Sequence, residues 1–323
     1  MISALIRKTR ACLLLLCLST QISAQVEVTV DISQVDTTGF NHFVYATNQG
    51  YHFLYLDKPL TIQVERLPTL IELKTSDDIM LVNSKYLWAT TQEIVLKGSI
   101  RQGTLEPVTK VAGQEMADKV FAATFEELEQ DATLRYTPAY ALLLYRDRNI
   151  TEIAEFKEYI KLAPEDLRSF WVFSKLEDIV ERYDNLGYNE KTEVLTGFNV
   201  LTRSGERRSY QLTNQKPLLL SLISPNCYKC DRDIERLAVL HSRYNDKIDL
   251  LTMWDDESSN TIRSLHFFDE DLIKWPNYWD EDLLLNKKLG IEKEAAHILF
   301  DKEGKIIKRW NKPPKNLNKY LRD

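Results

Sequence analysis

The spacing of hydrophobic and polar positions changes along the chain and divides it into three regions. Over residues 25–110 the dominant period is two. In the first run Val26, Val28 and Val30 alternate with polar residues, which is typical of a strand with one buried face. Turn-forming residues separate further short apolar runs, which are 53–56, 60–64, 70–73, 80–82 and 93–96. This pattern predicts a β-rich domain over residues 25–110, built as a small sandwich or barrel.

Over residues 111–190 the spacing becomes helical. Val120, Phe121, Phe125 and Leu128 recur at helical spacing, and the segments 136–145 and 151–162 continue the pattern. A fourth helix is expected from Pro164 onward, because proline and acidic residues favour a first helical turn. We predict a helical segment packed beside the flanking domains, followed by a polar linker at residues 187–193.

Over residues 191–323 strand-like and helix-like runs alternate. Residues 217–223 are almost continuously apolar, as expected of a strand covered on both faces, and a helix follows with one apolar face. That face is formed by Ile234, Leu237, Ala238 and His241. The remaining expected elements are strands at 248–253, 296–300 and 305–310, and helices near 260–268, 280–289 and 316–321. A buried strand, a crossover helix, a second strand and a closing hairpin predict an α/β domain.

The first 24 residues have the composition of a targeting segment. Arg7, Lys8 and Arg10 precede a short apolar run, and Ala24 is a small residue at the expected cleavage position. We therefore expect residues 1–24 to be a signal peptide and the mature protein to be exported to the periplasm. Leu16 stands before Cys17 where a lipid-attachment motif needs a small residue, so a lipoprotein is disfavoured. No later run is long and apolar enough to predict a membrane helix.

Charge and cysteine content narrow the possible functions. The formal net charge of −6 does not favour a nucleic-acid partner. Cleavage after Ala24 would leave Cys227 and Cys230 as the only cysteines, too few for a disulfide framework. No second cysteine pair completes a zinc site and the five histidines show no ligand spacing, so we expect neither a metal nor a cofactor.

The two cysteines stand where the buried strand gives way to a helix. A helix start presents free N–H groups and a partial positive charge, which stabilise a thiolate on Cys227. Cys230 lies one turn further along and can attack a mixed disulfide formed at Cys227. We therefore expect Cys227 to be the more exposed and more acidic thiol, and Cys230 the more buried one.

Three runs of sequence carry a resemblance to a known family: KPLLLSLISPNCYKCDRDIERL, IDLLTMWDDES and LGIEKEAAHILFDKEGKII. Over about residues 194–323 the chain resembles the thioredoxin-like thiol–disulfide oxidoreductases of the TlpA/ResA type. The resemblance implies a thioredoxin-like fold, with Cys227 as nucleophile and Cys230 as resolving thiol. It also implies protein thiol or disulfide substrates and an electron donor. Residues 25–190 resemble the N-terminal extension of some such exported proteins.

Two positions depart from that family. Asn226 replaces the tryptophan that usually precedes the first cysteine, and Ala295 stands where the family has a cis-proline facing the disulfide. We therefore expect a trans Glu294–Ala295 peptide bond and weak general reductase activity. His297 is interpreted as a strand residue, although an approach to the sulfurs stays open. Trp275, Trp279, Phe267 and Phe268 are interpreted as core or lid packing rather than as a substrate surface.

Two classes of function are consistent with these features. One is an exported thiol–disulfide oxidoreductase that exchanges or reduces disulfides of protein substrates. The other is a catalytically weak or inactive thioredoxin-fold binding or scaffold protein. Residues 25–190 contain no cysteine and no nucleophile–base pairing, so we expect them to dock a partner or to dimerise rather than to catalyse.

Overall fold

The computed structural model forms two compact units, one of Met1–Thr47 and Tyr51–Ala122 and the other of Asn48–Gly50 and Ala123–Asp323. Each unit is described by itself. The structure describes residues 26–40, 42–47, 50–56, 60–76, 81–109, 111, 113–148, 151–202, 204–212, 215–224, 230–254, 273–291 and 295–321.

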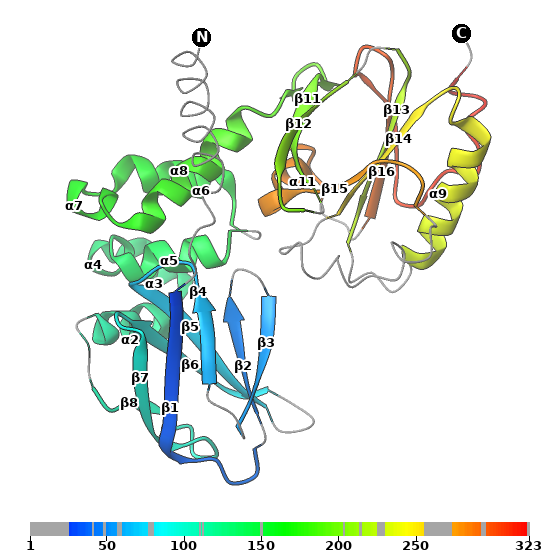
Figure 1. The fold of residues 1–323 in the computed structure, drawn as a ribbon. Coiled ribbons are helices and arrows are strands. Elements are labelled where there is room, and N and C mark those ends of the chain that lie inside the picture. Colours follow the sequence, from blue (N-terminus) through cyan, green and yellow to red (C-terminus); the bar gives the residue numbers. More distant parts are fainter. Residues whose placement is uncertain are drawn as a thin grey trace, which may run out of the picture. The chain divides into compact units, whose positions relative to one another are not determined.

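The strands of the first unit form two four-stranded sheets (Figure 1). One has the order β4-β1-β7-β8 and comprises Leu60–Val64, Val26–Asp36, Glu93–Ser99 and Glu106–Pro107. The other has the order β3-β2-β5-β6 and comprises Gly50–Tyr55, His42–Thr47, Thr69–Ser76 and Leu81–Ala89. β1 runs parallel to β7 and antiparallel to β4.

One hydrophobic core joins the two sheets. Val28 and Val30 of β1 are buried in the same cluster as Phe43 of β2, Ile71 of β5 and Leu87 of β6. The predicted alternation of β1 and the predicted sandwich are therefore confirmed. The sequence pattern missed β2 and ended β6 too early, at residue 82.

β6 continues to Ala89 although several polar residues interrupt its apolar pattern. It pairs with β5 along its whole length, up to Thr69 opposite Ala89, and helix α2 (Gln114–Ala122) bonds to it through its first side chain. Gln114 Oε1 accepts a hydrogen bond from Trp88 N at 2.8 Å, and Gln114 Nε2 donates one to Tyr86 O at 3.0 Å. Long-range contacts with β5 and α2, which the local period does not show, therefore accompany the polar part of this strand.

The second unit begins within the predicted helical segment 111–190, because α2 belongs to the first unit. Its helices are α3 (Phe125–Gln130), α4 (Ala132–Arg135), α5 (Pro138–Arg146), α6 (Ile153–Leu162), α7 (Glu165–Arg168) and α8 (Trp171–Asp184). Tyr140, Phe156, Tyr159 and Phe173 are buried between them. The fourth expected helix is split, because Phe170 adopts an extended conformation before α8 begins.

Residues 187–193 are not the linker that the sequence indicated. β9 (Tyr188–Asn189) and β10 (Val194–Leu195) pair antiparallel across this segment. Leu195 N donates to Gly304 O at 2.8 Å, and Ile306 N donates to Glu193 O at 3.2 Å. The short hairpin is thereby attached to a turn more than a hundred residues further along the chain. Polar composition alone did not reveal these long-range backbone bonds.

The rest of the unit is built on a seven-stranded sheet with the order β12-β11-β15-β14-β13-β16-β17 (Figure 1). The strands are β11 (Gly197–Leu201), β12 (Arg207–Gln211), β13 (Leu218–Ile223), β14 (Asp249–Trp254), β15 (Asn277–Trp279), β16 (Ala295–Phe300) and β17 (Ile306–Trp310). β13 pairs parallel with β14 and antiparallel with β16. A strand–helix–strand unit followed by a hairpin gives a thioredoxin-like α/β domain, as predicted.

Helix α9 (Cys230–Tyr244) connects β13 to β14 and covers one face of the sheet. Ile234 and Leu237 are fully buried against strand residues such as Leu219 and Leu250, as the helical period predicted. The apolar face that the sequence predicted for this helix differs from the buried face in the C-terminal half of α9. Leu240 and Tyr244 complete the buried stripe, whereas Ala238 and His241 are half-buried.

Residues 316–321 form a turn and not the expected last helix. Tyr244 on α9 holds this segment in place. Its hydroxyl donates to Asn318 Oδ1 at 2.9 Å and accepts from Leu317 N at 3.2 Å. Leu317 is fully buried, so the side-chain anchor replaces a regular helix. In the part of the chain that the structure describes, no helix combines the length and apolarity needed to cross a membrane.

Candidate functional site

The candidate site lies where β13 leads into α9. β13 is an inner strand of the sheet, between β14 and β16, and all six of its residues are buried. α9 begins at Cys230, seven positions after Ile223 ends the strand. Cys227 and the side chain of Cys230 lie outside the described residues. The assignment of these two cysteines as the redox pair therefore stays a prediction.

Ala295 lies at the same end of the sheet. It is the first residue of β16, and it pairs with Ile223, the last residue of β13. Ala295 is buried, with 8% of its surface exposed. The Glu294–Ala295 peptide bond lies outside the described residues, so its trans conformation stays a prediction. The strand register nevertheless places Ala295 beside the C-terminal end of β13, the end from which the chain leaves for α9.

Three polar side chains form a buried row across the central strands. Ser221 of β13 is in register with Thr252 of β14 and with His297 of β16, and all three are fully buried. Leu219 and Ile223 stand two positions to either side of Ser221 and belong to the core under α9. Because strand side chains alternate between faces, the row faces α9 as well.

Each end of this row is hydrogen-bonded. Ser221 Oγ lies 3.0 Å from His297 Nδ1, and Trp275 Nε1 donates to Thr252 Oγ1 at 2.9 Å. Burial lowers the pKa of His297 to about 3, so its imidazole is neutral at physiological pH. Its Nε2 has no hydrogen-bond partner among the described residues. The sequence analysis missed this row, although single polar residues within apolar strands were its signal.

The aromatic residues near the site belong to the core where they can be described. Trp275 and Trp279 are 4% and 1% exposed, and both pack in the cluster beneath α9. This confirms the interpretation of these two as core residues. Phe267 and Phe268 lie outside the described residues.

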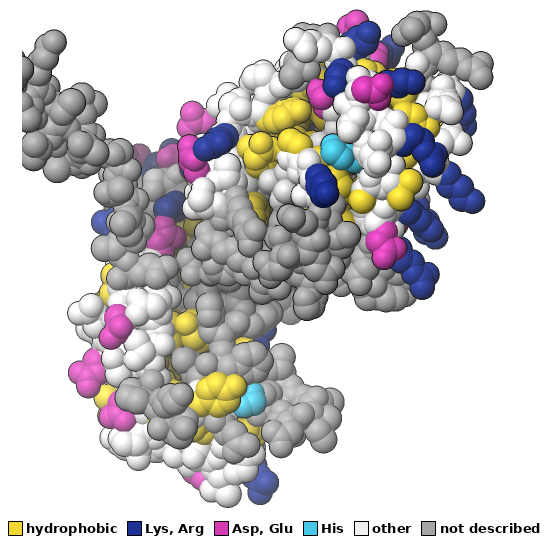
Figure 2. All heavy atoms as spheres, turned by 45° about the vertical axis from the view of Figure 1, so that its right-hand side comes forward, with side chains coloured by type: hydrophobic (Ala, Val, Ile, Leu, Met, Phe, Trp, Pro, Cys, Tyr) yellow, Lys and Arg dark blue, Asp and Glu magenta, His cyan; other side chains and the backbone are white. Residues whose placement is uncertain are grey.

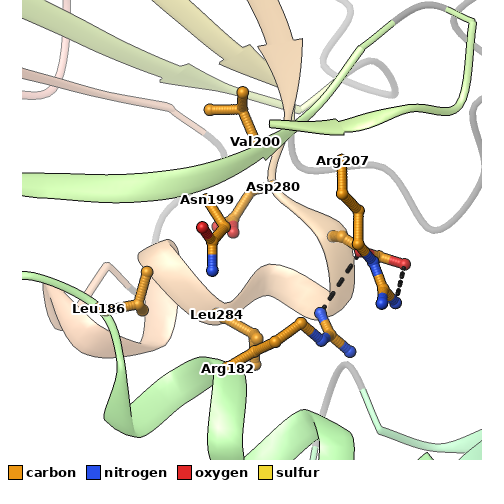
Figure 3. A pocket seen from close by; sticks show the side chains of 8 residues that line it. Arg182, Leu186, Asn199, Val200, Arg207, Asp280 and Leu284 are labelled. Carbon is orange, nitrogen blue, oxygen red and sulfur yellow. Dashed lines mark hydrogen bonds and ion pairs between the residues drawn. The ribbon is translucent and has the colours of Figure 1, made fainter. Parts of the chain in front are cut away.

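A charged cluster joins the helical segment to the sheet domain. Asp282, in the short helix η2 (Glu281–Leu283), is 7% exposed and pairs with Arg148 and Arg182. Burial alone would raise the pKa of Asp282, but the two arginines hold it below its ordinary value. Arg207 on β12 bonds to both carboxylate oxygens of Glu281, at 2.7 and 2.9 Å (Figure 3). The partners in these ion pairs are about a hundred residues apart in the sequence, so the local pattern could not predict them.

Asp280 supports the backbone beside this cluster. Its carboxylate accepts hydrogen bonds from Leu285 N at 2.8 Å and Asn286 N at 2.7 Å, at the start of α11 (Leu284–Lys288). Asp280 is 2% exposed, and burial raises its pKa to about 7 despite these two bonds. It therefore changes charge near neutral pH.

The recess beside this cluster has room for about one water molecule, roughly 20 Å³ (Figure 3). It is lined by Arg182, Leu186, Asn199, Val200, Arg207, Asp280, Glu281 and Leu284. Its two arginines are already engaged with carboxylates. The recess is thus part of a structural junction and is too small for a protein or peptide substrate.

The solved structures that this chain resembles are thioredoxin-like thiol–disulfide oxidoreductases, and each match covers only part of the chain. The thioredoxin domain of a thiol–disulfide oxidoreductase from Bacteroides vulgatus is 17% identical, and the match covers 41% of this chain and 97% of that one, with a TM-score of 0.36. A thiol–disulfide oxidoreductase from Bacteroides fragilis is 21% identical over 35% and 86% of the two chains, with a TM-score of 0.30.

A third similar structure is a secreted disulfide oxidoreductase of Mycobacterium tuberculosis that is homologous to DsbE of E. coli. It is 18% identical, and the match covers 37% of this chain and 86% of that one, with a TM-score of 0.31. No protein-family model matches the sequence, and no curated protein matches it.

Proposed function

We propose that this protein is an exported thiol–disulfide oxidoreductase in which Cys227 and Cys230 exchange or reduce disulfides of protein substrates. The observation that carries the proposal is the start of α9 at Cys230, just beyond the central buried strand of a thioredoxin-like sheet. The N-terminus of a fifteen-residue helix is an environment that favours a thiolate over a thiol. A Cys-x-x-Cys pair there has the spacing for two consecutive attacks on sulfur.

The proposed reaction proceeds in two exchanges. The Cys227 thiolate attacks one sulfur of a substrate disulfide, so a mixed disulfide forms and the other substrate thiolate leaves. The Cys230 thiolate then attacks the Cys227 sulfur, releasing the second substrate thiol and leaving a Cys227–Cys230 disulfide. The substrate gains two electrons, and a dithiol protein acting as electron donor returns the pair to its reduced state.

Each region of the chain has its own proposed role. Residues 1–24 act as a signal peptide, and residues 191–323 carry the thiol chemistry. The β-rich region 25–110 and the helical region 111–190 dock a partner or dimerise. The secreted character of the similar mycobacterial oxidoreductase agrees with export. Mass spectrometry of protein from the native host tests it, and an intact Met1 or a lipid on Cys17 would contradict it.

Insulin reduction in the presence of dithiothreitol tests the chemistry. We expect the mature protein to accelerate insulin precipitation and the Cys227→Ser variant to lose the acceleration. The Cys230→Ser variant retains the nucleophile but not the resolving thiol, so it should accumulate mixed disulfides with its substrates. Circular dichroism of both variants serves as the control for folding. If Cys227→Ser is as active as the parent, the proposed chemistry is wrong.

A binding module with an idle cysteine pair is the second candidate, and Ala295 favours it. This alanine heads β16 directly opposite the end of β13, where the resembling family has a proline that shapes substrate docking. The Ala295→Pro variant separates the two candidates. An increase in insulin reduction would indicate an enzyme limited by its docking loop. Absence of exchange in both proteins, with retained binding of a partner, would support the binding module.

A further inference from the structure

His297 carries a buried ring nitrogen that bonds to no other described group. The side chain has no exposed surface, and its Nε2 has no hydrogen-bond partner among the described residues. Lys and Arg side chains line the outer surface of this unit (Figure 2), but burial is the one cause of the lowered pKa of His297. A buried polar atom without a partner is rare in a protein core, so this nitrogen requires an explanation.

The bond to Ser221 indicates which nitrogen of the ring carries the proton. A buried serine hydroxyl needs an acceptor for its hydrogen. Ser221 is fully buried, and its oxygen bonds to His297 Nδ1 at 3.0 Å among the described residues. The hydroxyl therefore donates and Nδ1 accepts. Because the imidazole is neutral, its one ring proton is then on Nε2, which is a hydrogen-bond donor.

The same bond sets the direction in which Nε2 points. The ring is attached to β16 through Cγ, and Nδ1 points along the sheet toward Ser221 on β13. Nε2 lies on the far side of the ring from both, so its N–H points away from Ser221 and away from β16. Because the side chains of this row face α9, the N–H points into the layer between the sheet and that helix.

His297 is close to the end of the sheet at which α9 begins. It stands two residues after Ala295, which is in register with Ile223 at the end of β13. Two strand residues span roughly 7 Å, and one helical turn rises about 5.4 Å. α9 runs back over the sheet from this end, because it connects β13 to β14 and these two strands are parallel. The first turns of α9 therefore cover the part of the sheet that contains His297.

The helical period directs position 230 of α9 toward the same layer. Ile234 and Leu237 are fully buried in the cluster beneath this helix. Cys230 precedes Ile234 by four positions and Leu237 by seven, and residues at these spacings share one face of a helix. The period therefore predicts that the side chain at position 230 faces the layer into which Nε2 of His297 points.

We propose that His297 donates a hydrogen bond from Nε2 to the thiolate of Cys230, and that Ser221 holds the ring in the tautomer that allows it. This inference rests on the proposed oxidoreductase function and adds a residue to its second exchange. A hydrogen bond to the charged form favours that form, so it lowers the pKa of Cys230. The thiol proton leaves to solvent, and His297 keeps its own proton because burial makes its imidazole a weak base.

Two other roles for His297 make different predictions. If its bond to Ser221 only fixes the register of β13 and β16, substitution lowers stability and leaves the acidity of Cys230 unchanged. If the proton is on Nδ1 instead, Nε2 accepts a hydrogen bond from the neutral thiol and raises the pKa of Cys230. The size and the sign of a change in this pKa therefore distinguish the three roles.

The test measures the pKa of Cys230 by the ultraviolet absorbance of its thiolate. The background is the mature full-length protein with Cys227→Ser, in which Cys230 is the one remaining thiol. The test variants are His297→Leu and Ser221→Ala, and His297→Gln retains an N–H donor. The control is Leu299→Ala, which removes a fully buried apolar side chain from the same face of β16. Circular dichroism checks that each variant folds.

Other groups near the start of α9 are the same in every variant. Asp233, three residues after Cys230, is buried; burial raises its pKa, whereas Arg236 and Lys312 act to lower it. On the side of β17, Trp310 is in register with His297 and carries no charge. The contributions of these groups to the pKa of Cys230 therefore cancel when a variant is compared with its parent.

We expect the pKa of Cys230 to rise by about one unit in His297→Leu, which is about a tenfold loss of thiolate below the pKa. Ser221→Ala and His297→Gln should give smaller rises, and Leu299→Ala should change it by less than about 0.2 unit. An unchanged pKa in His297→Leu, or an equal rise in Leu299→Ala, would overturn the inference. A fall in His297→Leu would show that Nε2 accepts rather than donates, which also overturns it.

Nitrogen-15 NMR of the histidine rings tests the inference without any exchange reaction and without a folded variant at position 297. We expect His297 to be in the Nε2–H tautomer and its Nε2 resonance to shift as Cys230 ionises. If the ring responds but insulin is not reduced, the proposed function is wrong and the hydrogen bond is supported. If insulin is reduced but the ring does not respond, the function is supported and the inference is wrong. A proton on Nδ1 would also overturn the inference.

Discussion

Asp280 gives the sharpest prediction for stability, because it is a buried carboxylate that changes charge near neutral pH. Its ordinary pKa of 3.8 is raised to about 7 in the folded protein, chiefly by burial. The folded state therefore holds this proton more tightly than the unfolded state. The resulting stabilisation is complete below about pH 4, falls as the pH rises toward 7, and is absent at higher pH.

The size of the effect follows from the two pKa values. One pKa unit corresponds to about 1.36 kcal/mol, so the difference between 3.8 and about 7 corresponds to at most about 4 kcal/mol. Between pH 5 and pH 8 the wild-type protein should lose about 2.5 kcal/mol of unfolding free energy through this one group.

The Asp280→Asn variant removes this titration but can still accept one of the two backbone hydrogen bonds. Its stability at any single pH combines several effects, so the informative quantity is the difference between variant and parent. From pH 5 to pH 8 this difference should move in favour of the variant by about 2.5 kcal/mol. Urea unfolding followed by tryptophan fluorescence is suitable, because five of the six tryptophans lie in the second unit.

Asp246→Asn, at an exposed position on the same unit, corrects for the general effect of removing a negative charge. A difference between Asp280→Asn and the parent that stays constant within about 0.5 kcal/mol from pH 5 to pH 8 would refute the reasoning. It would mean that Asp280 gains enough solvation or hydrogen bonding to titrate in the ordinary range of a carboxyl group.

Three further predictions use matched variants and the same unfolding assay. Asp282→Asn keeps a side chain that tolerates the left-handed φ of 59° at this position, but it leaves Arg148 and Arg182 without their buried carboxylate. The free energy of unfolding at pH 7 should therefore fall by about 3–5 kcal/mol, and a fall of less than about 1 kcal/mol would contradict this. A Cβ at Gly304 would lie 1.9 Å from Leu195 O, whereas a Cβ at Gly205 would meet nothing within 4 Å. Gly304→Ala should therefore lower the free energy of unfolding far more than Gly205→Ala, for which a loss of roughly 1 kcal/mol is expected. Equal losses would exclude that close approach. Leu237 is fully buried, so Leu237→Ala should lower the free energy of unfolding by about 2–5 kcal/mol. Val239 is 55% exposed, so Val239→Ala should lower it by less than about 0.5 kcal/mol. Similar losses for the two variants would contradict the orientation of α9.

The sequence was most informative where burial imposes a local period. The continuous apolar run that became β13 and the stripe containing Ile234 and Leu237 on α9 were both predicted, because each faces one uniform core. The alternation of Val28 and Val30 predicted β1 for the same reason. Local hydrophobic patterning was thus sufficient for these elements and for the α/β class of the domain, whereas the thioredoxin-like fold was implied by the resemblance around the cysteine motif.

The sequence was least informative where a distant side chain or backbone group decides the local conformation. Residues 187–193 have linker composition, yet they pair with each other and with the turn at Gly304. Residues 316–321 have helical composition, yet the Tyr244 hydroxyl fixes them as a turn. At the candidate site, the cysteine motif was evident from spacing, whereas the bond between Ser221 and His297 depends on a strand register that only the fold provides.

The backbone attachment of the 188–195 hairpin bears on how this protein can be recombined with others. In a chimera with its crossover at residue 190, Asn189 and its strand partner Val194 would come from different proteins. The foreign segment would end next to the backbone hydrogen bonds that Glu193 and Leu195 form with the turn at Gly304. The incoming sequence would also have to leave the space beside Gly304 free. Exchange of the helical segment alone is therefore constrained at its C-terminal end. A crossover near residue 122, where one compact unit gives way to the next, avoids this constraint, so the helical segment and the thioredoxin-like domain should be inherited together.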